Sequence, residues 1–434
     1  MAGQGRSDVR RRAAWIMAIL ALALAARLAA GAWWQQRLPP GQKLAFGDSD
    51  SYWRLAQSLY RGEPFQYGSP DSRIFRTPGY PALLAALFKL LGTDDPPVLA
   101  VRALSATCGA AAVGVVMALG WRLFRPEVGL LAGLVAAVHP EAIALGTFVL
   151  SEAPFHPLML LNIFCLREAW AAASSHDSAR RATAWALAAG VAAGLATLMR
   201  PSWLLFTPYL LLLALLTASN RRCAARLALP LIVSLAATMA PWWLRNYEAA
   251  GRFVPTTLQV GASLYDGWRP DADGASDMRF VPEFYAAQKA ADAAATEPLT
   301  GTFEERLDRR HREAAVAWAK QNPRRVVELA WIKLRRMWSP LPNAAEMGGT
   351  LLRAATFCGY VPTMLLAVYG TLRLRRSTVG LWLLWIPALY LTNLHVIFVS
   401  SLRYRQPALL LLIVVAAAAA WEWRAGRAVK EPPR

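Results

Sequence analysis

The sequence predicts an all-α protein that crosses a membrane about ten times. Residues of the set AVILMFWYC make up 56% of the 434 positions, the mean hydropathy is +0.29, and charged residues are only 17%. Apolar runs of roughly twenty residues, the length that a helix needs to span a bilayer, recur along the whole chain. A soluble protein of this length would instead fold into several domains without such runs.

The apolar runs predict the order of the spans. The first run follows an Arg-rich N-terminus and is longer than the apolar core of a signal peptide, so it is expected to be an uncleaved first helix. One further segment, GYPALLAALFKLLG at 79–92, is short for a span and contains Lys89. The predicted spans are 13–34, 98–120, 128–148, 151–168, 183–200, 202–218, 227–244, 351–372, 379–399 and 405–422.

The basic residues predict the orientation. Loops on the cytoplasmic side of a membrane are enriched in Lys and Arg. If 79–92 does not cross, every short basic loop lies on the same side as the Arg-rich N-terminus; if it crosses, the later basic loops face outward. These basic residues are Arg122, Arg125, Arg167, Arg180, Arg181, Arg221, Arg222, Arg226, Arg373, Arg375, Arg376, Arg424, Arg427 and Lys430. We therefore expect both termini in the cytoplasm and 79–92 on the outer surface as a juxtamembrane helix.

The net charge of +19 fits the same interpretation. Basic clusters between apolar runs suit a membrane with an anionic inner leaflet, so no nucleic-acid partner is expected. The predicted parts are an N-terminal transmembrane module, 1–244, whose first outer loop is about 35–97; an extracytoplasmic region, 245–350; and C-terminal transmembrane helices with a basic tail, 351–434.

The outer region 245–350 is polar but contains amphipathic patterns. The stretch RRVVELAWIKLRRMW carries arginines on one predicted helix face and apolar residues on the other, so we expect this helix to lie on the membrane. The apolar face consists of Val327, Ala330, Trp331 and Leu334.

Polar residues gather at the outer ends of the predicted spans. Such residues are candidates for function, because separate loops would bring their carboxylates and arginines to one outer cavity. A carboxylate there could act as a general base, and arginines could hold a phosphate and stabilise its growing charge. The candidates are Asp48, Asp50, Arg73, Arg76, Ser151, Glu152, Arg200, Arg245, Asn246, His395, Arg403, Tyr404 and Arg405.

Structural roles are open for several of these residues. Asp48 or Asp50 could cap a helix that begins near Tyr52, because aspartate accepts the free N–H groups of a first turn. Glu152 could interact with a helix dipole. Arg200 and Arg245 could extend toward lipid headgroups.

The motifs, taken in order, carry a family resemblance. They are FGDSDSYWRLAQSLYRG, RTPGYPALLAALFKLLG, VRALSA, LSEAPF, MRPSW, PWWLRNY and RYRQP. The chain resembles the GT-C superfamily of polyprenyl-phosphate-sugar-dependent glycosyltransferases. It is most similar to the bacterial branch grouped with the dolichyl-phosphate-mannose–protein mannosyltransferases and the lipid A aminoarabinose transferase. The resemblance implies a GT-C-like fold and transfer of a hexosyl or pentosyl group from a polyprenyl-phosphate carrier on the extracytoplasmic face, usually with inversion.

The resemblance also implies roles for individual residues. The family pattern places the catalytic acid four residues before a tyrosine, here Tyr52, which selects Asp48 as the base. Asp50 is the reserve. The family often has Glu directly after the first acid, but Ser49 stands here, so Asp50 is a candidate to replace that second acid. Glu152 would lie near the site, and Arg245 and Arg403 near the donor phosphate. The expected substrate-binding set is Tyr52, Arg76, Glu152, Arg200, Arg245, Asn246, Arg403 and Tyr404.

Some GT-C enzymes use a divalent cation, and Asp48, Asp50 and Glu152 could supply carboxylates for one. A cation therefore stays possible, and no cofactor is certain. The acceptor could be a lipid, a glycan or a protein. A transporter or flippase of lipid-linked sugars is the alternative function, although it should carry polar residues at mid-membrane in paired halves. A subunit that keeps the fold without chemistry is a third class, which predicts a lost base.

Overall fold

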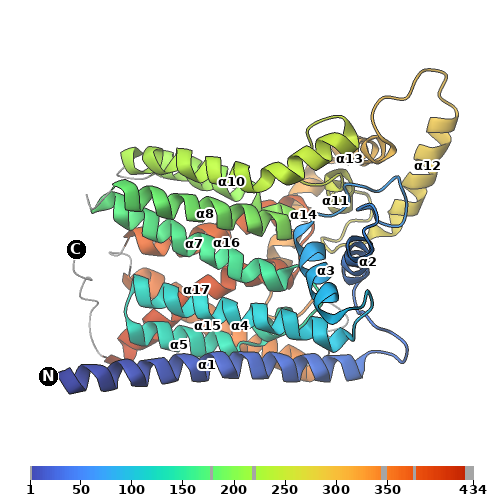
Figure 1. Ribbon diagram of the computed structural model, residues 1–434. Helices are drawn as coiled ribbons and strands as arrows, with labels where there is room; N and C mark the ends of the chain where they lie inside the picture. Colours follow the sequence, from blue (N-terminus) through green and yellow to red (C-terminus); the bar gives the residue numbers. More distant parts are fainter. Residues whose placement is uncertain (1, 176–178, 218–220, 344–348, 375–377, 426–434) are drawn as a thin grey trace.

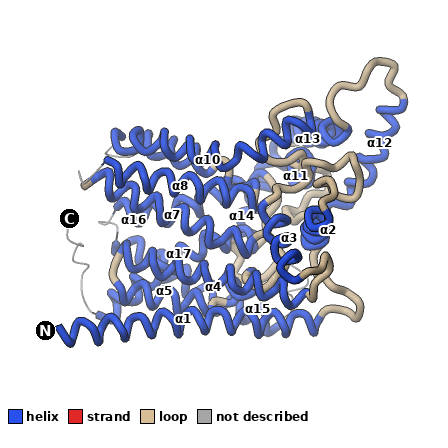
Figure 2. The backbone as a smooth tube through the Cα atoms, in the orientation of Figure 1, coloured by secondary structure: helices blue, strands red, loops and turns tan. Residues whose placement is uncertain are grey.

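The chain folds into helices joined by loops. The computed structural model describes residues 2–175, 179–217, 221–343, 349–374 and 378–425. No strand occurs in these ranges (Figure 2). The helices are α1 Ala2–Arg37, α2 Gly47–Arg61, α3 Gly79–Leu91, α4 Val98–Leu123, α5 Pro126–Val138, α6 Pro140–Leu145, α7 Glu152–Ser174, α8 Ala179–Met199, α9 Phe206–Thr217, α10 Arg221–Ala250, α11 Val260–Gly267, α12 Val281–Ala293, α13 Phe303–Gln321, α14 Pro323–Met337, α15 Thr350–Leu374, α16 Thr378–Ile397 and α17 Leu402–Ala425.

The long helices run side by side as one bundle (Figure 1). Among the described residues, seven helical segments are long and apolar enough to span a membrane: Asp8–Arg37, Val98–Leu123, Ala179–Met199, Arg221–Ala250, Thr350–Leu374, Gly380–Ile397 and Leu402–Arg424. The other predicted spans correspond to α5 with α6, α7, and α9 with the short 3-10 helix Pro201–Trp203. The chain is an all-α, multi-pass membrane protein, as the sequence predicts.

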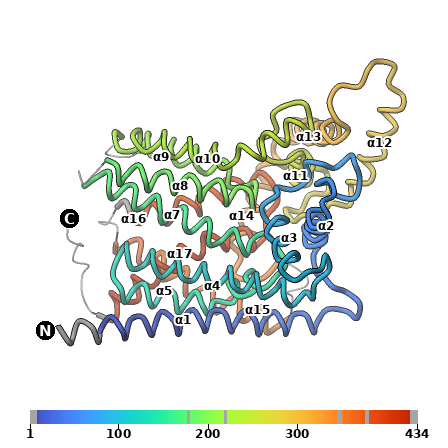
Figure 3. The backbone as a smooth tube through the Cα atoms, viewed as in Figure 1, coloured from blue at the N-terminus to red at the C-terminus, as the bar shows by residue number. Residues whose placement is uncertain are grey.

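The two ends of the bundle differ. At one end, Arg12 of α1 pairs with Glu127 of α5, and Arg125 lies over the ring of Trp421 in α17. The first loop and the helices α11–α14 lie at the opposite end, which the sequence predicts to face outward and which is called the outer end below (Figures 1 and 3). The predicted basic residues Arg375, Arg376, Arg427 and Lys430 lie outside the described residues.

Helix α17 is the centre of the bundle. Its residues from Ala408 to Ala419 are all buried. A helix that is apolar on every side is either buried in protein or exposed to lipid, and α17 is buried because it packs on α4, α5, α15 and α16. The position of α17 fixes where its first turn emerges at the outer end.

Small residues let some helices approach closely. A Cβ atom added to Gly120 of α4 would lie 2.8 Å from the Cα atom of Gly129 in α5. In a membrane, where lipid is as apolar as the helix surface, such backbone contact is a main source of helix association.

One predicted span is broken. The range 128–148 was expected to be a single helix, but α5 ends at Val138 and α6 begins at Pro140. His139 has φ −64° and ψ 123°, which is not helical. Proline disfavours the helical region for the residue before it and lacks an N–H donor, so the helix is interrupted there.

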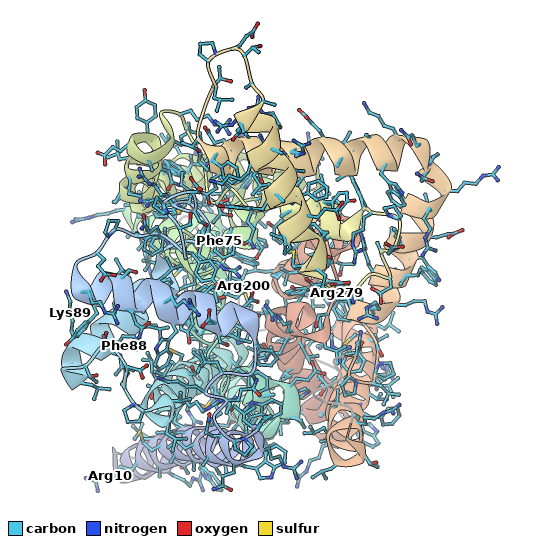
Figure 4. The ribbon with its side chains drawn as sticks, turned by 90° about the vertical axis from the view of Figure 1, so that its right-hand side faces the viewer. Arg10, Phe75, Phe88, Lys89, Arg200 and Arg279 are labelled. Atoms are coloured by element: carbon cyan, nitrogen blue, oxygen red, sulfur yellow. The ribbon has the colours of Figure 1, made fainter. Side chains whose placement is uncertain are left out.

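Helix α3 forms over the segment 79–92, which is short for a span, and it begins and ends at the outer end of the bundle. After α3, Asp94 accepts a hydrogen bond of 2.7 Å from the Nε atom of Arg61, which precedes α3. Likewise, Trp53 donates from Nε1 to Asp95 at 3.0 Å. Figure 4 looks onto this end and labels Phe88 and Lys89 of α3, of which Phe88 is buried and Lys89 exposed. The chain after α3 thus contacts helix α2, which precedes α3, so α3 does not carry the chain to the other end of the bundle.

Helix α14 forms where the sequence predicts a helix, but the face that it buries is not the predicted apolar one. Leu329, Lys333 and Met337 are buried, whereas Val327 and Trp331 are 72% and 59% exposed. The exposed pair suits contact with lipid, which stays a prediction.

The placement of α3 predicts the outcome of a topology experiment. A reporter that is active only outside the cytoplasm, fused near residue 95, should be active, because 79–92 does not return the chain to the cytoplasm. Alkaline phosphatase activity in cells would measure this. A fusion near residue 125 is the matched control and should be inactive. A cytoplasmic signal near residue 95 would make 79–92 a true span and reverse the orientation of every later loop.

Candidate active site

Two arginines from distant parts of the chain donate hydrogen bonds to Asp48. Its Oδ1 atom accepts a hydrogen bond of 2.6 Å from Nη2 of Arg76, in the first outer loop. Its Oδ2 atom accepts one of 2.7 Å from Nη2 of Arg403, in the first turn of α17. The Asp48 side chain nevertheless keeps 30% exposure, so a molecule outside the bundle can reach it.

Glu152 forms the second half of the cluster. Its Oε1 atom lies 2.5 Å from Nη1 of Arg200 and 2.8 Å from Nε of Arg403. Arg403 therefore bridges Asp48 and Glu152. The Glu152 side chain is only 1% exposed, in contrast to Asp48. Of the two carboxylates, Asp48 is the one that an acceptor could approach.

Local sequence places each of these side chains. Helix α2 begins at Gly47, earlier than the start near Tyr52 expected from the sequence, so Asp48 lies in its first turn, where the helix dipole favours an anion. Arg200 precedes Pro201 and adopts an extended conformation, φ −141° and ψ 115°, that ends α8. Figure 4 shows Arg200 near the middle of the outer end.

The arginines control the charge state of Asp48. Burial on its own would raise the pKa of this carboxyl, but the charges of Arg76 and Arg403 and the hydrogen bond from Arg403 hold the pKa well below its usual range. Asp48 is therefore an anion at any physiological pH. An anion held by two cations is also a weak base, which any catalytic role must account for.

Two tyrosines complete the cluster. The Tyr52 hydroxyl donates to Ser151 Oγ at 3.1 Å, and the Tyr52 ring lies 5.2 Å from the guanidinium of Arg76. The Tyr404 ring stacks on His395 with centroids 4.0 Å apart and lies 5.6 Å from the guanidinium of Arg200. Six residues of the predicted set thus meet Asp48 at one place: Tyr52, Arg76, Glu152, Arg200, Arg403 and Tyr404.

Asp50 points elsewhere. Its Oδ2 atom pairs with Nε of Arg54 at 2.9 Å and accepts a hydrogen bond of 3.2 Å from the Tyr67 hydroxyl. Neither aspartate caps α2, because the cap residue is Phe46, which has no side-chain cap bond.

Arg245 and Asn246 hold backbone segments and not the carboxylates. Arg245 donates to the carbonyl oxygens of Arg73 at 2.7 Å and Phe65 at 2.8 Å. Asn246 donates to the carbonyl oxygen of Val254 at 3.0 Å. Their contact with a substrate stays a prediction.

Arg405, a further candidate, is fully buried and also lies apart from the cluster. It pairs with Glu141 of α6 at 2.5 Å and donates to the carbonyl oxygen of Met337. Burial of such an ion pair requires that all its groups are satisfied, which these contacts achieve.

Sequence reasoning missed three residues that support the site. Gln259 accepts a hydrogen bond of 3.2 Å from Nη1 of Arg76. Lys333, whose pKa burial lowers to about 8, donates to the carbonyl oxygen of Ile397 at 2.8 Å, just before α17. Glu304 binds backbone N–H groups of the first loop. The capping box of Thr302 and Glu305 is readable in the sequence and marks the start of α13, but it does not reveal these partners.

The carboxylates do not form a set of metal ligands. In the described ranges, no three His, Cys, Asp or Glu residues are placed to hold an ion together. Asp48 and Glu152 share an arginine, and Asp50 is turned to Arg54. In this arrangement Asp48, Asp50 and Glu152 are not placed to share a divalent cation, because each gives at least one oxygen atom to a guanidinium group. A cation in the reaction stays a prediction.

Part of the chain matches a known protein family. Residues 76–244, less than half of the sequence, match the model of the dolichyl-phosphate-mannose-protein mannosyltransferase family. The matched segment includes Arg76, Glu152 and Arg200, whereas Asp48 and Arg403 lie outside it. No protein of curated function matches the chain in sequence.

Solved structures resemble nearly the whole chain. The oligosaccharyltransferase of Archaeoglobus fulgidus in the apo form has a TM-score of 0.58 and 16% identity, over 94% of this chain and 51% of that chain. The same archaeal enzyme, AglB, with an inhibitory peptide and a dolichol-phosphate gives 0.55 and 14%, over 96% and 52%. ArnT from Cupriavidus metallidurans bound to undecaprenyl phosphate gives 0.46 and 17%, over 95% and 78%.

This chain spans about half the length of the oligosaccharyltransferase, so the likeness concerns the fold. The matched segment contains the motifs RTPGYPALLAALFKLLG, VRALSA, LSEAPF and MRPSW, whereas FGDSDSYWRLAQSLYRG and RYRQP lie outside it. The predicted resemblance of this chain to the GT-C glycosyltransferases is thereby confirmed.

Proposed function

We propose that this protein is a glycosyltransferase that moves a sugar from a polyprenyl-phosphate carrier to an acceptor hydroxyl on the extracytoplasmic face of a bacterial inner membrane, with both termini in the cytoplasm. The observation that carries the proposal is the cluster in which Arg403 joins Asp48 to Glu152 at one end of a membrane bundle. Binding of dolichol-phosphate by the archaeal enzyme of the same fold supports a lipid-linked donor.

The charge of the cluster suits a sugar-phosphate donor. Arg76, Arg200 and Arg403 contribute three positive charges and Asp48 and Glu152 two negative ones, which leaves one positive charge. A phosphodiester carries one negative charge, and the phosphate that leaves carries up to two. Arginines arranged in advance around this position would stabilise the charge that develops during transfer.

The reaction is proposed to invert the anomeric centre. The acceptor oxygen forms a bond to the anomeric carbon while the bond from that carbon to the phosphate oxygen breaks. The acceptor proton moves to Asp48, and polyprenyl phosphate leaves with the electron pair of the broken bond. Asp48 is favoured over Glu152 as the base because it is the more exposed of the two carboxylates.

Asp48 must first be released from its arginines. Both of its oxygen atoms accept hydrogen bonds from guanidinium groups, so neither is free to take a proton. The phosphate of a donor matches these guanidinium groups better than the carboxylate of Asp48 does, so it can replace Asp48 as their anion. When Arg76 or Arg403 turns to the phosphate, the pKa of Asp48 rises toward its usual value. Donor binding thus prepares the base, and the donor is expected to bind before the acceptor.

An apolar cavity beside α17 supports the lipid part of the donor. It has a volume of about 460 Å³ and lies between α5, α15 and α17. Cys358 and Pro362 of α15 border it, and Ile413 on α17 lies ten residues beyond Arg403, about 15 Å along the helix. A prenyl chain whose phosphate meets Arg403 could enter this cavity.

The alternative, a transporter or flippase, has less support. It would need a polar site at mid-membrane between two related halves. The cluster of Asp48, Glu152 and their arginines lies at the end of the bundle where α2 is found (Figure 1), and the sequence has no repeat of fixed period. A non-catalytic subunit would have no need of the exposed Asp48.

Asp48→Asn is expected to reduce transfer at least 100-fold, because a general base contributes about that factor or more. Mass spectrometry of envelope lipids, glycans and glycoproteins from a deletion strain complemented with each variant would measure the product. Asp94→Asn, in the same outer loop, is the matched control and should restore the wild-type product. Full activity of Asp48→Asn, with loss in Asp50→Asn, would contradict the assignment.

The rate at which Cys358 is alkylated should show whether the lipid chain of the donor lies in this cavity. Undecaprenyl phosphate is expected to slow alkylation of Cys358 by N-ethylmaleimide several-fold, because the chain fills the cavity that this exposed thiol borders. Peptide mass spectrometry of the purified protein in nanodiscs measures the rate. Inorganic phosphate, which lacks the chain, is the control and should leave the rate unchanged. Equal rates with and without the lipid would place the chain elsewhere.

A further inference from the structure

The short segment 73–76 of the first outer loop is held from several sides. The carbonyl oxygen of Ile74 accepts a hydrogen bond of 2.9 Å from the N–H of Leu258, and its side chain is buried against α8 and α10. The carbonyl oxygen of Arg73 binds Arg245, as described above. Two residues after Ile74 stands Arg76, which holds Asp48. Anything that fixes Ile74 therefore also limits where the Arg76 guanidinium can reach.

Glu304 of α13 also binds the segment 73–76. Its Oε2 atom accepts hydrogen bonds from the N–H groups of Arg73 at 2.8 Å and Ile74 at 2.9 Å. The side chain is 8% exposed, and its Oε1 atom has no hydrogen-bond partner among the described residues. The segment 245–350 and the first outer loop, more than 200 residues apart, are joined here by one carboxyl group.

We propose that Glu304 is a positioning residue, which holds the Arg73–Ile74 backbone so that Arg76 faces Asp48 and the donor phosphate. The region 245–350, which contains Glu304 and is the second outer region of the chain, thereby completes the donor site. This inference rests on the proposed function, because it assigns Arg76 to the phosphate of the donor.

The charge of Glu304 is sensitive to pH near neutrality. Burial raises its pKa from the usual value of 4.5 to about 7, against the effect of the two backbone N–H groups and Arg245. Asp308 of α13 adds to the increase, and Arg73 and Glu248 lie near Arg245, the cation that faces this carboxyl. We call the two hydrogen bonds from the N–H groups of Arg73 and Ile74 to Glu304 the clamp, which is closed when both bonds are formed. A carboxyl whose pKa is higher in the closed clamp takes up a proton as these bonds form. The clamp should therefore strengthen as the pH falls through about 7 and be weakest above it.

Three variants separate positioning from a merely structural role. Glu304→Gln imitates the protonated carboxyl, Glu304→Ala removes the clamp, and Glu297→Gln makes the same change at an exposed position between α12 and α13. The full chain in nanodiscs is titrated with undecaprenyl phosphate at pH 5.5 and 8.5, with tryptophan fluorescence as the readout. The Kd of each variant is compared with that of the wild type at the same pH, so the titration of the lipid phosphate cancels.

Glu304→Gln should bind roughly five-fold more tightly than the wild type at pH 8.5 and equally, within about two-fold, at pH 5.5. Glu304→Ala should bind more weakly at both pH values, and Glu297→Gln should match the wild type. In an Arg76→Ala background, Glu304→Gln should have no effect, because the clamp acts through Arg76. A Kd ratio that does not change with pH, or an effect that persists without Arg76, would overturn the inference.

Hydrogen exchange tests the clamp without a ligand. In the wild type, the amides of Arg73 and Ile74, corrected for intrinsic exchange, should be protected on the order of ten-fold more at pH 5.5 than at pH 8.5. The same protection at both pH values would contradict the clamp even if Glu304→Gln did not fold. Failure of the wild type to bind undecaprenyl phosphate, with pH-dependent protection intact, would instead count against the proposed function.

Discussion

The bridge that Arg403 makes between Asp48 and Glu152 is the interaction on which the outer site depends. It joins the first turn of α2 to the first turn of α7 through the central helix α17. Breaking a buried ion pair leaves an uncompensated charge, which typically costs about 3–5 kcal/mol, whereas the intact pair contributes little net stability. The cluster is therefore better explained by a need for charge at this place than by folding.

The same bridge constrains the chemistry. A carboxylate bound by two arginines cannot be a strong base, and arginines bound by carboxylates are not free to bind phosphate. Under the proposed function, both conditions change together when the donor phosphate binds, because the guanidinium groups can exchange one anion for another. The donor-free site then is a stable resting arrangement. Glu304 and Gln259 extend this arrangement to the second outer region, because both hold Arg76 or the backbone next to it.

The sequence predicted the bundle well, because long apolar runs indicate membrane-spanning helices. The orientation inferred from the basic loops stays a prediction. It also predicted that Asp48, Glu152 and Arg403 converge, since motif order places all three at outer span ends. The break at His139 could have been read from Pro140. The backbone groups that bind Arg245 and Glu304 could not be predicted from the sequence. Every residue has a backbone carbonyl, and nearly every residue has an N–H group, so residue type does not show which of them forms such a hydrogen bond.

A structure of the full chain in a nanodisc with undecaprenyl phosphate tests the central claim most directly. The account predicts phosphate density within hydrogen-bond distance of Arg403 and of Arg76 or Arg200, with at least one oxygen atom of Asp48 released from its arginine. Phosphate bound elsewhere on the outer end, for example at Arg245, would contradict the account. Phosphate bound at the cluster while Asp48 keeps both arginines would contradict its role as the base that donor binding prepares.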